Sequence, residues 1–302
     1  MNTVSRSTVV VGLDPSDPAR AAASYAAEVA SRRNLPLRLV HALEGSQYAL
    51  GPRAIGWTVD VEGVMQSSAQ RLLDETTERL RGHYPGLEVS SKVQPGSAND
   101  ALIEESEHAE LLVLGSRGRG GFADLVIGST TLHAASHARC PVIVVPGPLI
   151  DATSRKGVIV GVDGSELSDA AIQFGFQIAS ETRERLTALH AWHDPAPTGI
   201  GLMVPLVYDP AWVDKEEQLI LAESMAGWWE KYPEVEVVHE IVRDHAVHAL
   251  VTRAATATLL VVGSRGRGPV RGLLLGSVSH GVLHHATSPV AIVHPDNRAP
   301  RP

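Results

Sequence analysis

The sequence predicts an α/β fold built from two tandem, doubly wound sheets, each with five parallel strands. The chain has 302 residues, which is long enough for two domains that each bury a core. Its first half recurs in its second half at an offset of about 149 residues. Within each half, apolar β-branched runs alternate with segments of helical periodicity, the pattern of a parallel sheet covered by helices on both faces.

The repeat is visible in three matched segments. They pair Thr8–Ser16 with Gly157–Ser165, Leu39–Ala42 with Ala188–Ala191, and Pro141–Val145 with Pro289–Val293. We therefore expect one domain over residues 1–147 and a second over residues 156–295. The short linker between them begins with Pro146-Gly147-Pro148.

The first half predicts nine elements in alternation. The expected strands are Thr8–Leu13, Leu37–Ala42, Leu87–Val93, Leu111–Gly115 and Val142–Val145. Ser16 caps a helix that carries Pro18 in its first turn and ends near Asn34. The other expected helices are Asp60–His83, with Val64, Leu72, Leu73 and Leu80 on its apolar face, then Ala98–Glu107 and Ser129–Ala138.

The second half predicts the same order. Its expected strands are Val158–Val162, Arg185–Ala191, Val235–Val242, Leu259–Gly263 and Pro289–Val293. Its expected helices are Ser165–Ser180, Pro210–Tyr232, His245–Thr256 and Ser277–His285. The halves differ most in the loop Asp194–Pro205, which is richer in proline and glycine than its counterpart.

Composition describes an ordinary globular chain. Hydrophobic residues make up 44% and charged residues 20%, and 34 acidic against 26 basic side chains give a net charge of −8. That balance argues against a nucleic-acid partner held by a broad basic face. The single cysteine, Cys140, excludes an intrachain disulfide, and no signal-peptide pattern or membrane-length apolar run occurs. We therefore expect a cytoplasmic, reduced protein without a membrane partner.

A glycine-rich loop follows the fourth strand of each half. The first runs Gly115-Ser116-Arg117-Gly118-Arg119-Gly120-Gly121 and continues to Gly128-Ser129-Thr130. The second runs Gly263-Ser264-Arg265-Gly266-Arg267-Gly268-Pro269 and continues to Gly276-Ser277-Val278-Ser279. Both have the spacing G-x-x-G, nine residues, G-S, and both lead from a strand to the start of a helix.

That context suits an anion. Glycine lets backbone approach a ligand or adopt positive φ, and N–H groups at a helix start, with Ser129 and Ser277 at the cap, favour negative charge. No Gly-Lys-Ser/Thr follows, so this is not a Walker A loop, and the third glycine of a dinucleotide fingerprint is replaced by Ala123 and Arg271. A flexible surface turn explains one such loop, but its recurrence with identical spacing favours a site.

The two loops resemble the nucleotide motif of the universal stress protein family, in the tandem form abundant in actinobacteria. The motif is matched by Gly115, Gly118, Gly128 and Ser129, and again by Gly263, Gly266, Gly276 and Ser277. The resemblance implies a Rossmann-like sheet of the HUP type with strand order 3-2-1-4-5 and ATP bound across strands one and four. It also implies pairing through the fifth strands.

The same resemblance assigns the adenosine end of each site to residues after the first two strands. These are Gly12, Asp14 and Ala42 in the first half, and Gly161, Asp163, Ala191 and Asp194 in the second. The loop backbones and serine hydroxyls would bind the phosphates, and Thr130 and Val278 would add N–H groups. Arg117, Arg119, Arg265 and Arg267 would pair with phosphate oxygens or stay solvated. Pro269 replaces Gly121 and offers no N–H.

Other residue patterns compete with this site. His133 with His137, and His280 with His284, are four residues apart on expected helices, but neither pair has the glutamate of a metalloprotease motif. We interpret them as surface histidines. His41 and His190 lie at matching strand ends, where a structural hydrogen bond is the favoured role. Cys140 is expected to be buried, and Trp228-Trp229 are expected in core or dimer packing.

No paired carboxylates and no Ser-His-Asp order accompany the loops. The sequence therefore predicts an ATP- and Mg²⁺-binding stress-response protein, more plausibly a regulator than an enzyme, which acts on an unidentified protein partner. A slow ATPase or phosphotransferase and a pure interaction scaffold are the alternatives. The short fifth strands, Pro141–Val145 and Pro289–Val293, are apolar edges that we expect to pair within the chain, and the tandem chain is expected to form a homodimer.

Overall fold

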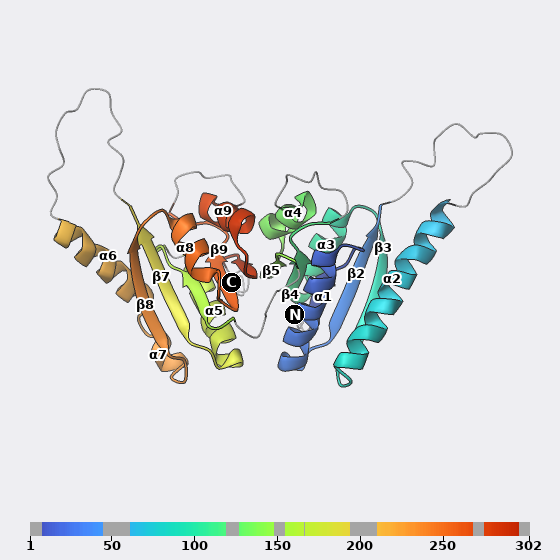
Figure 1. The fold of residues 1–302 in the computed structure, drawn as a ribbon, viewed down its shortest axis with the longest axis horizontal. Coiled ribbons are helices and arrows are strands. Elements are labelled where there is room, and N and C mark those ends of the chain that lie inside the picture. Colours follow the sequence, from blue (N-terminus) through green and yellow to red (C-terminus); the bar gives the residue numbers. More distant parts are fainter. Residues whose placement is uncertain are drawn as a thin grey trace, which may run out of the picture. The chain divides into compact units, whose positions relative to one another are not determined.

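The structure is a computed structural model that describes residues 8–44, 61–118, 127–147, 155–165, 167–193, 210–267 and 275–295. The chain divides into two compact units, Met1–Ile150 and Asp151–Pro302. Each unit is an α/β layer structure with helices packed on a parallel sheet (Figure 1).

In the first unit the sheet has the strand order β3-β2-β1-β4-β5. Neighbouring strands are parallel, with Val10 opposite Arg38 on one side and Leu112 on the other. The strands are β1 (Thr8–Gly12), β2 (Leu37–Leu43), β3 (Val89–Pro95), β4 (Ala109–Gly115) and β5 (Val142–Val145).

The second unit repeats this arrangement with the order β8-β7-β6-β9-β10. Its strands are β6 (Val158–Gly161), β7 (Leu186–Trp192), β8 (Val237–Arg243), β9 (Leu259–Gly263) and β10 (Val290–Val293). The predicted fold class and the order 3-2-1-4-5 are therefore confirmed in both halves.

Helices connect the strands in the expected alternation. The first unit contains α1 (Asp17–Arg33), α2 (Val61–His83), α3 (Ala98–Ser106) and α4 (Ser129–His137). The second contains α5 (Asp169–Thr182), α6 (Pro210–Ser224), α7 (Trp228–Lys231), α8 (Ala246–Ala254) and α9 (Ser277–His285).

The chain reverses its winding direction between the first and fourth strands of each sheet. From β1 it winds outward through β2 to β3, and it then returns past β1 to β4 and β5. In the first unit α1 contacts α2, and α3 contacts α4. Because the central strands are covered on both faces, Val9, Val11, Leu111 and Val113 have no exposed surface. The loops after β1 and β4 meet at one edge of the sheet, where ligands of such folds bind.

Three helix predictions need correction. Val64 was placed on the apolar face of α2 but is 59% exposed, because the buried positions of this helix begin at Ala69, one turn later, and include Leu73. The expected long helix Pro210–Tyr232 is interrupted after α6, where Gly227 adopts a left-handed φ of +77° that ends helical winding. Trp228 and Trp229 consequently lie on the short α7.

The first helix of the second unit also begins later than predicted. It was expected from Ser165 but begins at Asp169, with Ser168 as the N-cap. The first unit differs because Ser16 accepts a hydrogen bond from Ala19 N and proline occupies the first turn of α1. Ser165 Oγ donates to Asp163 just as Ser16 Oγ donates to Asp14, but in the second unit Ser168 N and Ser168 Oγ both donate to Ser165 O, and this turn precedes the helix.

The aromatic and cysteine predictions are largely confirmed. Trp228 stacks on Phe176, with ring centroids 5.6 Å apart, and Tyr232 stacks on the same ring at 5.3 Å. Trp229 does not share this core, because its side chain is 67% exposed. Cys140 is buried, as expected for a small apolar residue.

A buried carboxylate links three elements of the first unit. Glu105 of α3 accepts hydrogen bonds from Lys92 Nζ of β3 at 2.7 Å and from Arg38 Nη1 of β2 at 3.0 Å. Burial by itself raises the pKa of Glu105, but the bonds from Lys92 and Arg38 outweigh it and hold the pKa below its ordinary value. The matching pair in the second unit has its charges exchanged, since Arg253 of α8 binds Glu240 of β8 at 2.6 Å.

We predict that Glu105→Gln lowers the free energy of unfolding of the first unit by about 1–2 kcal/mol at neutral pH. A carboxylate with a lowered pKa stabilises the fold above its unfolded-state pKa, and this contribution is lost as pH falls through the folded-state pKa. The difference between the parent and the variant should therefore shrink below about pH 4. Denaturant unfolding followed by hydrogen exchange in β2 and β3 measures it.

Glu240→Gln is the matched control. Its ion pair is more exposed, with Arg253 at 53% and Glu240 at 27%, so the substitution should cost less than about 1 kcal/mol. Equal losses in the two variants would show that burial of Glu105 does not strengthen its ion pairs.

Candidate functional site

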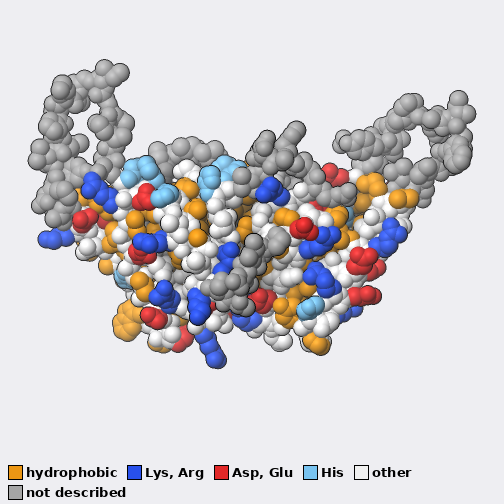
Figure 2. Space-filling view, viewed as in Figure 1, with side chains coloured by type: hydrophobic (Ala, Val, Ile, Leu, Met, Phe, Trp, Pro, Cys, Tyr) orange, Lys and Arg blue, Asp and Glu red, His pale blue; other side chains and the backbone are white. Residues whose placement is uncertain are grey.

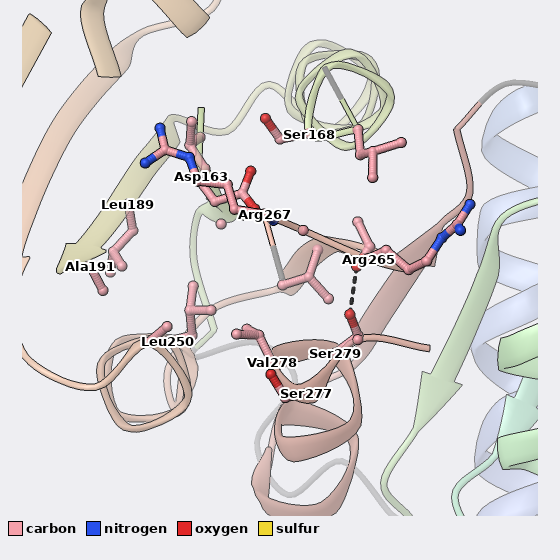
Figure 3. Close-up of a pocket in the computed structure, with 18 residues that line it drawn as sticks. Asp163, Ser168, Leu189, Ala191, Leu250, Arg265, Arg267, Ser277, Val278 and Ser279 are labelled. Carbon is pink, nitrogen blue, oxygen red and sulfur yellow. Dashed lines mark hydrogen bonds between the residues drawn. The ribbon is translucent and has the colours of Figure 1, made fainter. Parts of the chain in front are cut away.

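A pocket of about 460 Å³ lies in the second unit at the carboxyl ends of β6, β7 and β9 (Figure 3). Its volume is in the range of small-molecule sites, about 300–1,000 Å³. The residues that line it are Gly161, Val162, Asp163, Leu167, Ser168, Leu189, Ala191, Ala246, Leu250, Val262, Gly263, Arg265, Gly266, Arg267, Gly276, Ser277, Val278 and Ser279. They come from the edge of the sheet where the winding reverses.

Hydrogen bonds hold the described ends of the second glycine loop against each other. Ser264 N donates to Val293 O of β10 at 2.7 Å, and Gly276 N donates to Ser264 O at 2.7 Å. Ser279 Oγ donates to Gly263 O at 2.7 Å (Figure 3). These bonds fix the start of α9 beside the end of β9.

The first unit builds its loop with the same bonds. Ser116 N donates to Val145 O at 2.8 Å, and Gly128 N donates to Ser116 O at 2.7 Å. Thr131 Oγ1 donates to Gly115 O at 2.8 Å, in the role that Ser279 has in the second unit. The repeated sequence spacing thus corresponds to a repeated loop geometry.

The helix starts differ from the prediction in one respect. Ser129 and Ser277 were expected at the cap, but the N-caps are Gly128 and Gly276, and no described side chain makes a cap hydrogen bond there. Glycine has no side chain that bonds the first-turn N–H groups. The N–H groups of the first turn of α9 therefore lie at the pocket without a competing serine cap.

An aspartate anchors each glycine loop. Asp163 Oδ1 accepts from Ser165 N at 3.0 Å, and Asp163 Oδ2 accepts from Arg267 N at 2.9 Å. A Cβ added at Gly266 would lie 2.2 Å from Asp163 Oδ2. The carboxylate therefore ties the loop after β6 to the glycine loop after β9.

The same contact explains the middle glycine of the first loop. A Cβ added at Gly118 would lie 2.6 Å from Asp14 Oδ2. Two roles were expected for Gly118 and Gly266, namely close approach to phosphate or a positive φ. The positive φ is wrong, since neither residue adopts one. The approach of the chain's own carboxylate requires glycine at both positions.

Apolar side chains form the other wall of the pocket. Leu189 and Ala191 come from β7, and Ala246 and Leu250 come from α8. Sequence reasoning found Ala191 but missed seven lining residues, which are Val162, Leu167, Ser168, Leu189, Ala246, Leu250 and Val262. They lack a motif, and the only signal available was the two-residue alternation that places Leu189 on the face of β7 that Ala191 shares.

The remaining predicted residues of the second half have definite places. Ser264 is fully buried behind the loop and does not line the pocket. Arg265 and Arg267 are exposed, and Figure 3 shows the Arg265 guanidinium directed away from the pocket. The Arg267 guanidinium lies over Gly164, where an added Cβ would be 2.2 Å from Nη2. Asp194 and Gly268 lie outside the described residues.

The predicted residues of the first half occupy the corresponding positions. Gly12 and Gly115 end β1 and β4, Ala42 lies in β2, and Asp14, Ser116, Arg117 and Gly118 follow the strands. Gly128 caps α4, and Ser129 and Thr130 form its first turn. Arg119, Gly120 and Gly121 lie outside the described residues.

The structural role predicted for the two strand-end histidines is confirmed. His41 Nδ1 donates to Leu13 O at 2.7 Å, and His190 Nδ1 donates to Val162 O at 2.7 Å. His190 also contacts Glu217 of α6, with 2.6 Å between Nε2 and Oε2. No pattern in the sequence predicts this second contact.

The two rings of each helical histidine pair lie close together, stacked in the first unit and tilted in the second. The rings of His133 and His137 are 4.1 Å apart, and those of His280 and His284 are 4.5 Å apart. Burial, followed by the charges of His280 and His285, lowers the pKa of His284. Within the described ranges, no group of three or more His, Cys, Asp or Glu side chains is arranged to hold a metal ion.

The surface and the helices add two observations. Figure 2 shows basic and acidic side chains interspersed on the visible face of the described residues. No helix in the part of the chain that the structure describes is long and apolar enough to cross a membrane.

Comparison with known proteins decides the family. The model of the universal stress protein family matches residues 5–146 and again residues 154–294. The chain belongs to the universal stress protein family. A universal stress protein of Mycobacterium tuberculosis is 38% identical over 94% of this chain and 96% of its own length.

A solved universal stress protein shares this fold. A crystal structure of one from Archaeoglobus fulgidus covers 97% of this chain and 98% of its own, with a TM-score of 0.67 at 19% identity. Another structure from the same organism, a complex with dAMP, covers 46% of this chain and 96% of its own at 25% identity, with a TM-score of 0.34.

For this universal stress protein we predict that Asp163→Ala loosens the second glycine loop. The variant removes the acceptor of Arg267 N, so amide exchange at Arg267 should accelerate about tenfold, the equivalent of one hydrogen bond. Hydrogen exchange read by NMR measures it. Asp17→Ala, at an exposed carboxylate of α1, should leave that rate unchanged. Parental exchange at Arg267 in Asp163→Ala would show that the carboxylate does not hold the loop.

Proposed function

We propose that both halves of this protein bind ATP with Mg²⁺, and that the bound nucleotide alters its assembly or its binding of a partner. One observation carries the proposal. The glycine loop leads into a helix whose N-cap makes no side-chain hydrogen bond, and both border a pocket with an apolar wall where the winding of the sheet reverses. The resemblance to the ATP-binding motif of the family supports the choice of nucleotide.

The pocket has two chemically different ends. Leu189, Ala191 and Leu250 offer apolar contact to a planar base. The first turn of α9, at Ser277 and Val278, adds N–H groups that suit phosphate oxygens. A nucleotide that spans these ends would place its base against α8 and its phosphates at the glycine loop.

Charge explains the inclusion of Mg²⁺. The loop lacks the lysine of a Walker A motif, and Arg265 points away from the pocket. Both carboxylate oxygens of Asp163 are already bonded to the chain. A divalent ion held mainly by phosphates and water would offset the triphosphate charge, as is usual for Mg²⁺, and the Ser277 hydroxyl in the pocket lining is a protein oxygen that could join it.

The regulatory role is proposed because the residues around the pocket offer no evident nucleophile and base pair. The homodimer, the pairing of fifth strands within the chain, the domain boundaries and the cytoplasmic location stay predictions. A slow ATPase or phosphotransferase and a nucleotide-free scaffold are outcomes that the experiments below distinguish.

We predict that saturating Mg·ATP titrates two sites per chain in calorimetry, because both halves carry the loop and its aspartate anchor. Mass spectrometry of the denatured protein should identify released adenine nucleotide. A stoichiometry of one or less contradicts the two-site proposal. Product formed above a trace rate would favour the ATPase, and no bound or titratable nucleotide would favour the scaffold.

We further predict that Gly118→Ala with Gly266→Ala weakens ATP binding about five- to 150-fold, on the order of 1–3 kcal/mol. Each new Cβ would collide with the aspartate that anchors its loop and would displace the loop N–H groups. The fold should persist, since both residues lie outside strands and helices. Gly86→Ala, where nothing lies within 4 Å, is the matched control.

Circular dichroism first establishes that the double variant is folded. Unchanged ATP affinity in that folded protein contradicts the proposal that the glycine loops hold the nucleotide.

A further inference from the structure

Helix α6 contacts two residues that adjoin the lining of the second pocket, His190 and Gly164. At the base, Glu217 of α6 contacts His190, whose Nδ1 bonds the carbonyl of the pocket residue Val162. At the rim, a Cβ added at Gly164 would lie 2.4 Å from Ile220 Cγ2, one turn later on α6, and beside the Arg267 guanidinium. A shift of α6 would therefore change its contacts with His190 and Gly164, the two residues beside the pocket.

The contact between His190 and Glu217 contains one shared proton. Val162 O can only accept, so Nδ1 of His190 carries a proton. A carboxylate oxygen lies 2.6 Å from Nε2, and a hydrogen bond there requires a proton on either the ring or Glu217. His190 is only 4% exposed, so water does not readily replace this partner. Loss of the proton would set a lone pair against a carboxylate.

Among the described residues of the first unit, no carboxylate bonds the matching histidine. His41 repeats the bond to the strand-end carbonyl, through Leu13 O. The buried leucines Leu73 and Leu221 occupy equivalent positions in the two repeats, so the first-unit equivalent of Glu217 is Ala69. Alanine offers no carboxylate, so the two halves differ at this position in the chemistry that faces the histidine.

We propose that Glu217, acting through His190, is a positioning residue that makes ligand binding by the second pocket depend on one proton, a device without a counterpart among the described residues of the first unit. The inference rests on the proposed nucleotide binding and concerns the regulation of that site. With the proton present, the pair holds α6, and with it Ile220, against the Gly164 turn. Without it, α6 loosens and the pocket loses a fixed edge.

Other titratable groups surround this end of β7, but they have partners of their own. Asp163 bonds Ser165 and Arg267 N, Asp244 bonds His248, and the ring of His193 rests on that of His245. On β8 the residue in register with His190 is the uncharged Ile241. The charged or titratable residues farther along these elements include Asp169 and Glu181 on α5, His239, Glu240 and Arg243 on β8, Arg253 on α8, and Asp214, Lys215, Glu216 and Glu223 on α6 itself.

The test isolates the second pocket in a Gly118→Ala background and compares Glu217 variants. The Kd for Mg·ATP is measured across pH 6 to 9 for the parent, Glu217→Gln and Glu217→Ala, with the exposed Glu216→Gln as the matched control. A glutamine amide can donate to the neutral ring without a shared proton. The titration of the ligand itself is common to all variants and cancels in the comparison.

We expect the affinity of the parent and of Glu216→Gln for Mg·ATP to fall as pH rises. The affinity of Glu217→Gln should show nearly none of this additional fall. Glu217→Ala should bind about tenfold more weakly at neutral pH. Matching pH profiles in the parent and both Glu217 variants would overturn the inference.

A measurement without ligand separates this inference from the proposed function. Hydrogen exchange in α6, corrected for intrinsic rates, should show protection that falls with pH in the parent and stays constant in Glu217→Gln. This response, with no nucleotide bound by any variant, would support the positioning pair and overturn the nucleotide proposal. Nucleotide binding with identical α6 protection in all variants would do the reverse.

Discussion

The bond between an aspartate carboxylate and the glycine loop is the contact on which each site depends. Asp163 connects the end of β6 to the loop after β9, two segments that are about a hundred residues apart in the chain. Because its Oδ2 lies where a Cβ of Gly266 would be, the contact requires glycine at that position. An acidic residue beside a proposed phosphate site is tolerable since both of its oxygens are already bonded to the chain.

The two halves use one design with different details. Thr131 and Ser279 make the same hydroxyl bond to a strand-end carbonyl. The ion pair of Glu105 and Lys92 in the first half is replaced by that of Arg253 and Glu240 in the second. The charges on the helix and the strand are exchanged, so the two still attract each other. By contrast, Glu217 faces His190 where the first half has alanine, and this substitution is not balanced by another. Duplicated units can thus keep a common loop geometry while the residues beside the loop differ in charge.

The sequence determined the fold class and most of the loop. Apolar runs in alternation with helical periods predict a parallel sheet, because each strand buried on both faces must be apolar throughout. The recurrence of Gly115, Gly118 and Gly128 at identical spacing located the glycine loops without any coordinates. The resemblance to a known family supplied the strand order, which periodicity by itself does not contain.

Tertiary structure decided what depends on contacts between distant segments. The exposure of Val64 depends on where the packing of α2 begins. The role of Gly118 depends on the carboxylate of Asp14, which is more than a hundred residues away in the sequence. Leu189 and Leu250 line the pocket only because β7 and α8 meet there. Local spacing determines which residues can form a strand, a loop or a cap, whereas the long-range packing of those elements determines which side chains share a site.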